Sequence, residues 1–220
     1  MRAAILLLAA LALPSWADLT VVQKTEGVMN SGQLMLRIKG DKARADIAPQ
    51  ITMITDLATG DTVTLNHSAK TMVRIAGAES AKMRLLAAGL KPGAEPPKLL
   101  PTDRKEKVEN RDCQVFTWRV GELEVTDWID SNYADWKTIL GELQRFQNAG
   151  LANSAQPLMP PLDQFPGMVI KREMNHKGTK TTSTLVSVKT DAVDAKVFDV
   201  PEGYKEQPAP KLPEAASPGK

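Results

Sequence analysis

The sequence is poor in the residues on which most catalytic and metal sites depend. One cysteine and two histidines occur among its 220 residues, whereas a transition-metal site needs clustered His, Cys or carboxylate ligands. No glycine-rich phosphate loop and no nucleophile elbow is found in it. We therefore expect no metal, no cofactor and no catalytic residues, and the chain is predicted not to be an enzyme.

A large excess of one charge is also lacking. The 28 basic and 26 acidic residues give a formal net charge of +2, and no Lys/Arg cluster indicates a nucleic acid or a polybasic membrane patch. Beyond the first residues, no apolar stretch reaches the ~20 residues that a membrane span needs. The sequence therefore predicts no nucleic-acid partner and no transmembrane segment, and it leaves the protein partners unknown.

The N-terminus has the layout of a secretory signal peptide. A short positive start, Met1-Arg2, leads into the apolar run Ala3–Leu13, which Pro14 ends. Ser15 and Ala17 are the small residues that precede a cleavage site, so we expect residues 1–17 to be removed before Asp18. An uncleaved anchor or a core helix is the alternative for this segment. The expected location is the periplasm or the cell exterior.

Short alternating segments dominate the mature chain. Apolar residues recur at a spacing of two in Leu34, Leu36 and Ile38, which places these side chains on one face of a strand. The turns between such segments are of hairpin length, so neighbouring strands should be antiparallel. Six short strands, each with one face in water, are predicted from 19 to 75. Later strands are predicted at 105–109, 113–120, 122–129, 168–174 and 181–189, with a last short one at 195–200.

Two segments are predicted to be helices. Residues 78–88 hold strong helix formers before Gly89, a good C-terminal cap. Residues 133–148 follow Asn132, a good N-terminal cap, and carry an apolar stripe from Tyr133 to Phe146, whereas Glu142 is among the residues assigned to the polar side. A helix with one apolar face has to bury it, and the apolar side of the sheet is the expected partner.

Proline-rich stretches mark the boundaries of these elements. Residues 89–101 and 157–166 hold four prolines each and are predicted to be loops. The segment 207–220 holds four more with few apolar groups, and it is predicted to be a disordered tail. The domain prediction is therefore a signal peptide at 1–17, one domain at 18–206 and a tail at 207–220.

Several stretches of the chain resemble a known family. They are Asp56–Gly60, Leu65-Asn66 and Lys70–Met72 in the hairpin region, and the closing Phe198–Tyr204, which reads Phe-Asp-Val-Pro-Glu-Gly-Tyr. With the order of hairpins, helices and strands, the chain resembles the periplasmic lipoprotein-carrier (LolA-like) superfamily, in an exported branch of unknown function. The resemblance implies a mostly β (α+β) fold. Its curved antiparallel sheet forms an incomplete barrel with a concave face covered by helices, where the carriers hold acyl chains of lipoproteins.

Two groups offer alternatives to a purely structural reading. Cys113 lies in a predicted strand and is expected to be a buried free thiol, because free cysteine behaves as a small hydrophobe; a nucleophilic role would need a histidine within reach. Glu122 and Glu124 share a predicted strand face and form a carboxylate pair or, as we favour, part of a solvated face.

A cluster of large apolar residues leaves the function open. The aromatic residues either fill the core between sheet and helix or line a cavity for an apolar chain. The main hypothesis is a non-catalytic binding or carrier protein for a lipid or lipoprotein acyl chain; the alternatives are an envelope module with a filled core and, last, a hydrolase on a β scaffold. The predicted cavity lining is Leu36, Phe116, Trp118, Trp136, Ile139, Leu140 and Leu143.

Overall fold

A computed structural model describes residues 18–27, 31–87, 95–149 and 159–209. The predicted signal peptide at 1–17, the predicted helix cap Gly89 and residues 210–220 of the predicted tail lie outside these residues.

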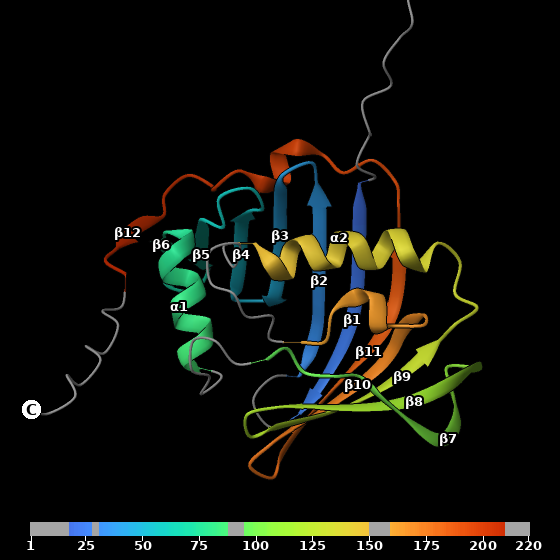
Figure 1. The fold of residues 1–220 in the computed structure, drawn as a ribbon. Coiled ribbons are helices and arrows are strands. Elements are labelled where there is room, and N and C mark those ends of the chain that lie inside the picture. The colour runs from blue at the N-terminus through green and yellow to red at the C-terminus, as the bar shows by residue number, and fades with distance from the viewer. Residues whose placement is uncertain (1–17, 28–30, 88–94, 150–158, 210–220) are drawn as a thin grey trace, which may run out of the picture.

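The described residues form one 12-stranded sheet in the order β12-β6-β5-β4-β3-β2-β1-β11-β10-β9-β8-β7. All neighbours pair antiparallel except β12, which pairs parallel with β6. The two ends, β12 and β7, do not meet, so the curved sheet is an incomplete barrel, as predicted (Figure 1). The strands are β1 (Leu19–Gly27), β2 (Gly32–Lys39), β3 (Lys42–Ala48), β4 (Ile51–Asp56), β5 (Thr62–Asn66), β6 (Thr71–Ile75), β7 (Leu100–Val108), β8 (Arg111–Val120), β9 (Leu123–Asp130), β10 (Met168–His176), β11 (Thr179–Lys189) and β12 (Lys205–Gln207).

Helices cover the concave face of this sheet. The helix α2 (Trp136–Asn148) crosses the middle strands, and α1 (Gly77–Ala87) stands beside β5 and β6, while the short 3-10 helix η1 (Leu162–Gln164) lies below α2 (Figure 1). Ile139 and Leu140 of α2 are buried in one apolar core with inward-facing residues of β1 and β2. The predicted partnership of helix and sheet is confirmed.

The predicted start of α2 is wrong. Asp135 adopts a left-handed conformation with φ of 54°, so the helix begins at Trp136 and Asn132 does not cap it. Asp is among the few residues that tolerate this conformation, which breaks the helical path. Tyr133 consequently lies outside the helix, where the guanidinium of Arg111 sits 4.7 Å from its ring centroid.

Glu142 was assigned to the polar side of α2, and this is also wrong. Its side chain is buried and pairs with Arg145 at 2.8 Å. Arg145 in turn donates to the Gly40 carbonyl and to Asp41, which lie in the turn between β2 and β3. The turn therefore covers this side of the helix, a contact that helical periodicity cannot reveal.

The strands β4 and β5 do not have one wet face each. Thr52 and Leu65 point away from α2 and are nevertheless buried. The segment after β11 returns across the same convex face and ends in β12, beyond β6. This segment contains the 3-10 helix η2 (Ala195–Phe198) where a strand at 195–200 was predicted. Its strand β12 runs one residue past the predicted domain end at 206.

Two glycines test how tightly the elements pack. A Cβ on Gly167 would lie 2.3 Å from the Asp130 carbonyl oxygen, at the meeting of β9 and β10, whereas a Cβ on Gly141 of α2 would meet nothing within 4 Å. We expect Gly167→Ala to lower the free energy of unfolding by about 1–3 kcal/mol or more. Gly141→Ala should raise it by about 0.5–1 kcal/mol, because glycine weakens a helix interior. Urea unfolding of both variants measures this, and equal stability would contradict it.

Candidate functional site

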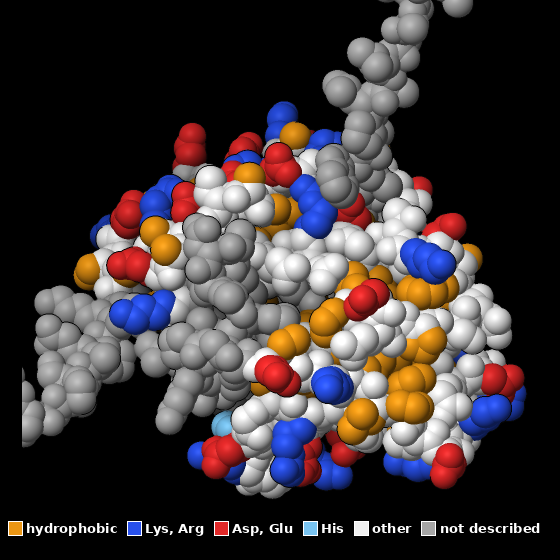
Figure 2. Space-filling view, viewed as in Figure 1, with side chains coloured by type: hydrophobic (Ala, Val, Ile, Leu, Met, Phe, Trp, Pro, Cys, Tyr) orange, Lys and Arg blue, Asp and Glu red, His pale blue; other side chains and the backbone are white. Residues whose placement is uncertain are grey.

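A cavity of about 390 Å³ lies between α2, the η1 region and the concave face of the sheet. Figure 2 shows hydrophobic side chains gathered at the surface on this side of the molecule. The apolar lining consists of Leu34, Leu36, Leu140, Leu143, Phe146, Met159, Leu162, Phe165, Met168, Val169, Ile170 and Met174. The polar lining consists of Gln23, Thr25, Gln147, Arg172, Thr181 and Ser183.

Strand alternation and one bulge place these side chains. Gln23 pairs with Leu34 across β1 and β2, so both face the same side of the sheet. In β10 the register with β9 shifts between Val169 and Lys171. A bulge of this kind re-aims side chains, and here the consecutive residues Val169 and Ile170 both line the cavity.

One charged residue reaches the wall of this cavity. Arg172 donates from Nε and Nη2 to the two carboxylate oxygens of Asp127, at 2.7 and 2.9 Å. Asp127 is fully buried and also accepts a 2.8 Å bond from Nε1 of Trp118. The guanidinium lies 5.4 Å from the centroid of the Trp118 ring. The buried Asp127 carboxylate thus holds Arg172 in place through two hydrogen bonds. The bonds from Arg172 and Trp118 in turn satisfy the carboxylate.

The seven predicted lining residues separate into two groups. Leu36, Leu140 and Leu143 lie on the cavity wall. The other four pack into the core beside it: Phe116, Trp118 and Ile139 are buried, and Trp136 packs against them half-buried. Whether any of the seven contacts a ligand stays a prediction.

Sequence reasoning missed Arg172 and the residues around η1. A signal for the former exists in β9, where Asp127 takes an inward position between the apolar Val125 and Ile129. A carboxylate at such a position needs a buried partner. The residues around η1 carry no such signal, because they were part of a proline-rich loop.

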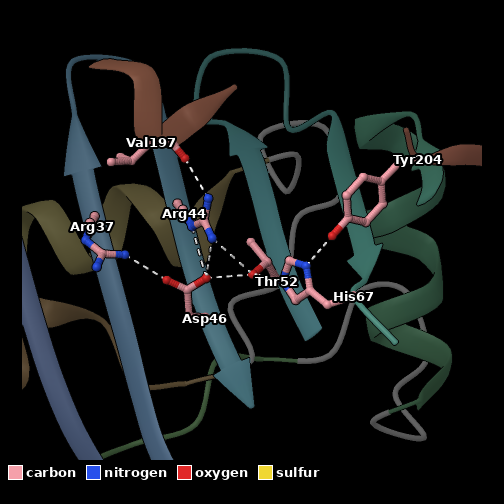
Figure 3. Close-up of polar contacts among 7 residues, drawn as sticks. All are labelled: Arg37, Arg44, Asp46, Thr52, His67, Val197 and Tyr204. Atoms are coloured by element: carbon pink, nitrogen blue, oxygen red, sulfur yellow. Dashed lines mark hydrogen bonds and ion pairs between the residues drawn. The ribbon is translucent and has the colours of Figure 1, made fainter. Parts of the chain in front are cut away.

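A second cluster lies on the opposite face of the sheet, away from α2 (Figure 3). Asp46 accepts hydrogen bonds from Arg37 at 2.7 Å, from Arg44 at 2.9 Å and from Thr52 at 2.6 Å. Arg44 also donates to the Val197 carbonyl at 2.8 Å. These residues line a groove of about 400 Å³. Arg44 therefore ties the returning C-terminal segment to the sheet.

A histidine continues this cluster toward the closing motif. Nε2 of His67 lies 2.8 Å from the Thr52 hydroxyl, and Nδ1 is hydrogen-bonded to the hydroxyl of Tyr204 (Figure 3). Tyr204 is the last residue of the Phe198–Tyr204 stretch. Because Arg44 of β3 and His67, which follows β5, bind residues that precede β12, the cluster has a clear structural role.

The Asp46 carboxylate should make this cluster sensitive to acid. Burial raises the pKa of Asp46, but the hydrogen bonds from Arg44 and Thr52 and the charge of Arg44 outweigh it, so the pKa lies below its ordinary value. Such a group adds stability above its unfolded pKa of ~3.9, and the stability is lost as the pH falls through the folded pKa.

We expect Asp46→Asn to lower the free energy of unfolding by about 1–3 kcal/mol at neutral pH. The difference from the wild type should shrink as the pH falls below about 4, because the wild-type carboxylate then becomes protonated. Urea unfolding across this pH range measures the difference in the free energy of unfolding. The control is Asp191→Asn at an exposed position, which should change neither the stability at neutral pH nor its dependence on pH. A difference independent of pH would refute the role of the carboxylate charge.

The structure places the groups considered for catalysis in a strand interior and at the surface. Cys113 is buried, as predicted, and burial raises its pKa to about 11, so the thiol stays protonated at neutral pH. Glu122 and Glu124 are exposed and pair with Lys177 and Arg119, respectively. Among the described residues, no group of three or more His, Cys, Asp or Glu is placed to hold a metal ion.

No helix in the described ranges is long and apolar enough to cross a membrane.

The model of one protein family matches most of the chain. This family is described as a domain of unknown function (DUF4412), and the match covers residues 22–204. Among curated protein sequences none matches.

Three kinds of solved structure are similar at low identity. PNGF-II, in two crystal forms, aligns with TM-scores of 0.42 and 0.43 and identities of 13% and 12%, covering 88% of this chain and 32% and 31% of its own. This chain thus spans about a third of PNGF-II. The Mycobacterium tuberculosis lipoprotein LppX aligns with a TM-score of 0.37 and 8% identity. The alignment covers 81% of this chain and 89% of LppX. A DUF1329 family protein from Desulfovibrio piger aligns with a TM-score of 0.32 and 9% identity. The alignment covers 84% of this chain and 90% of that protein.

Proposed function

This chain belongs to the family described as a domain of unknown function (DUF4412), and we propose that it binds the apolar chain of a lipid or lipoprotein in the cavity under α2. The binding involves no catalysis and no cofactor. The protein acts after export, in the periplasm or outside the cell.

The observation that carries this proposal is the apolar cavity itself. Its volume of about 390 Å³ falls within the range of ~300–1,000 Å³ that is usual for small-molecule sites. Its walls combine leucine, isoleucine and phenylalanine with the flexible thioethers of Met159, Met168 and Met174, which adapt to varied apolar partners. An acyl chain that enters gains about 25 cal/mol for each Å² of apolar surface removed from water.

The titratable groups near the cavity support a proposal of binding without catalysis. Arg172 is the charged residue of the lining, and both contacting oxygens of its partner Asp127 are engaged. A serine or threonine hydroxyl of the lining would act as a nucleophile only beside a general base. Neither the protonated thiol of Cys113 nor the surface-paired Glu122 supplies one inside the cavity.

Two features of the sequence support the place of action and the ligand class. The N-terminal 17 residues have the pattern of a secretory signal. The resemblance to LolA-like lipoprotein carriers agrees with the curved sheet and its helix-covered concave face. We therefore include carriage of an acyl chain through the envelope in the proposal.

A blocked cavity tests the proposal. Ser183→Trp places an indole on the cavity wall, whereas Thr182→Trp, its neighbour in β11, points to the other face of the sheet. Isothermal titration calorimetry with decanoate and with monodecanoylglycerol should show saturable binding of at least one probe to the wild type, with a negative heat-capacity change. Ser183→Trp should weaken that binding at least about tenfold, and Thr182→Trp should retain it.

Two outcomes would reject it. If neither probe binds the wild type, the filled-core envelope module becomes the better account. If Ser183→Trp and Thr182→Trp bind equally well, the ligand site lies elsewhere on the protein.

A further inference from the structure

A polar row crosses the floor of the cavity. Asp127 of β9 pairs with Arg172 of β10, Arg172 pairs with Ser183 of β11, and Ser183 pairs with Thr25 of β1. Directly opposite residues in antiparallel strands share a face and have Cβ atoms about 4.5–5.5 Å apart. Arg172, Ser183 and Thr25 all line the cavity. Their hydrogen-bonding groups therefore meet a ligand together, in contrast to the apolar wall formed by α2.

This row carries no net charge. The Arg172 guanidinium and the Asp127 carboxylate face each other through two short bonds. Asp127 is fully buried, so water does not screen the pair on its side. The positive charge that a ligand meets at Arg172 is offset by a negative charge directly behind it.

Hydrogen-bond donors nevertheless remain available in the row. Nε and Nη2 of Arg172 are turned to Asp127, whereas Nη1 makes no hydrogen bond within the described ranges, and the side chain keeps 20% of its exposure. A guanidinium carries five N–H donors, so donors at Nη1 stay free. Thr25 adds a hydroxyl, which can donate or accept; the Ser183 hydroxyl donates to Oε1 of Gln23 at 3.1 Å and offers a ligand its acceptor lone pairs.

We infer that the cavity prefers amphiphiles with an uncharged polar head, such as an acyl ester or an acylglycerol, over fatty-acid anions. The inference rests on the proposed function and names the ligand class of the same site. Ester carbonyls accept hydrogen bonds from the donors of this row, and glyceryl hydroxyls pair with its hydroxyls. A carboxylate would lose its hydration in front of a row without net charge, and burial of an uncompensated charge is costly.

Matched probes test the inference. Decanoate and monodecanoylglycerol carry the same acyl chain, and at about pH 8 the carboxylic acid is ionised. Calorimetry below the micelle concentrations of both should give an affinity for monodecanoylglycerol at least about tenfold higher than for decanoate. Equal or tighter binding of decanoate overturns the inference and leaves the proposed function intact. Binding of neither probe is a failure of the proposed function.

Variants of the pair test its cause. Asp127→Asn removes the compensating charge, so the affinity ratio of decanoate to monodecanoylglycerol should rise at least about tenfold. The double variant Asp127→Asn with Arg172→Gln is again neutral and should keep the wild-type order of the two probes, and it supplies the test if the single variant does not fold. An unchanged ratio in Asp127→Asn, or a reversed order in the double variant, overturns the role assigned to the pair.

Discussion

Arg172→Met lowers the free energy of unfolding by about 3–5 kcal/mol, the cost expected when a buried carboxylate loses its partner. Asp127 is fully buried and receives two of its hydrogen bonds from this guanidinium. After the substitution, the bond from Nε1 of Trp118 is the one that still reaches it from the described residues. Urea unfolding monitored by circular dichroism at neutral pH measures the loss.

The neutral double variant distinguishes a lost charge partner from lost packing. Asp127→Asn with Arg172→Gln removes both charges together, and replacement of a whole buried pair costs much less than removal of one partner. We expect it to recover most of the stability that Arg172→Met loses. A loss of under about 1 kcal/mol in Arg172→Met, the size typical of surface sites, would show that water reaches Asp127 and that the pair is not held as described.

Ile139→Ala lowers the free energy of unfolding by about 2–5 kcal/mol, as truncation of a buried isoleucine leaves a cavity that the core fills only in part. Ile139 is buried in the core and does not line the ligand cavity. Its stability loss should therefore come without a large change in lipid affinity, measured by calorimetry where the variant is fully folded.

Leu143→Ala, one turn further along α2, is the matched opposite. Leu143 is half-buried and lines the cavity, so its truncation should cost about 1 kcal/mol of stability and weaken lipid binding about tenfold. Equal effects of the two substitutions on binding would mean that α2 acts only as a structural cover.

The local part of the fold was predictable because alternation is a local signal. Leu34, Leu36 and Ile38 of β2 face the core as their spacing indicates, and the stripe on α2 faces the sheet. The start of α2 was not predictable in the same way, since the left-handed Asp135 breaks a pattern that remains apolar upstream. Propensity and spacing describe which side chains share a face, but not where the backbone leaves a helix.

The remaining features depend on residues far apart in the chain. β12 pairs with β6 across more than half of the sequence. Alternation places Leu65 on an apolar face, as observed, but it does not reveal that this face is the convex one, on which the C-terminal segment returns. The cavity raises the same difficulty: the pattern identifies inward residues such as Leu36, whereas the space between them depends on the placement of α2 and η1. The position of Arg172 in the cavity wall was not predicted, because its partner Asp127 lies 45 residues away in the sequence.

Methyl-detected NMR during titration with monodecanoylglycerol tests the central claim most directly. The account predicts saturable shifts of the methyl groups of Leu140, Leu143 and Met159, which line the cavity. Leu65, buried on the convex face, and the exposed Val186 should not shift. Saturable shifts confined to Leu65 or Val186, or no shifts at all, would contradict an apolar binding site under α2.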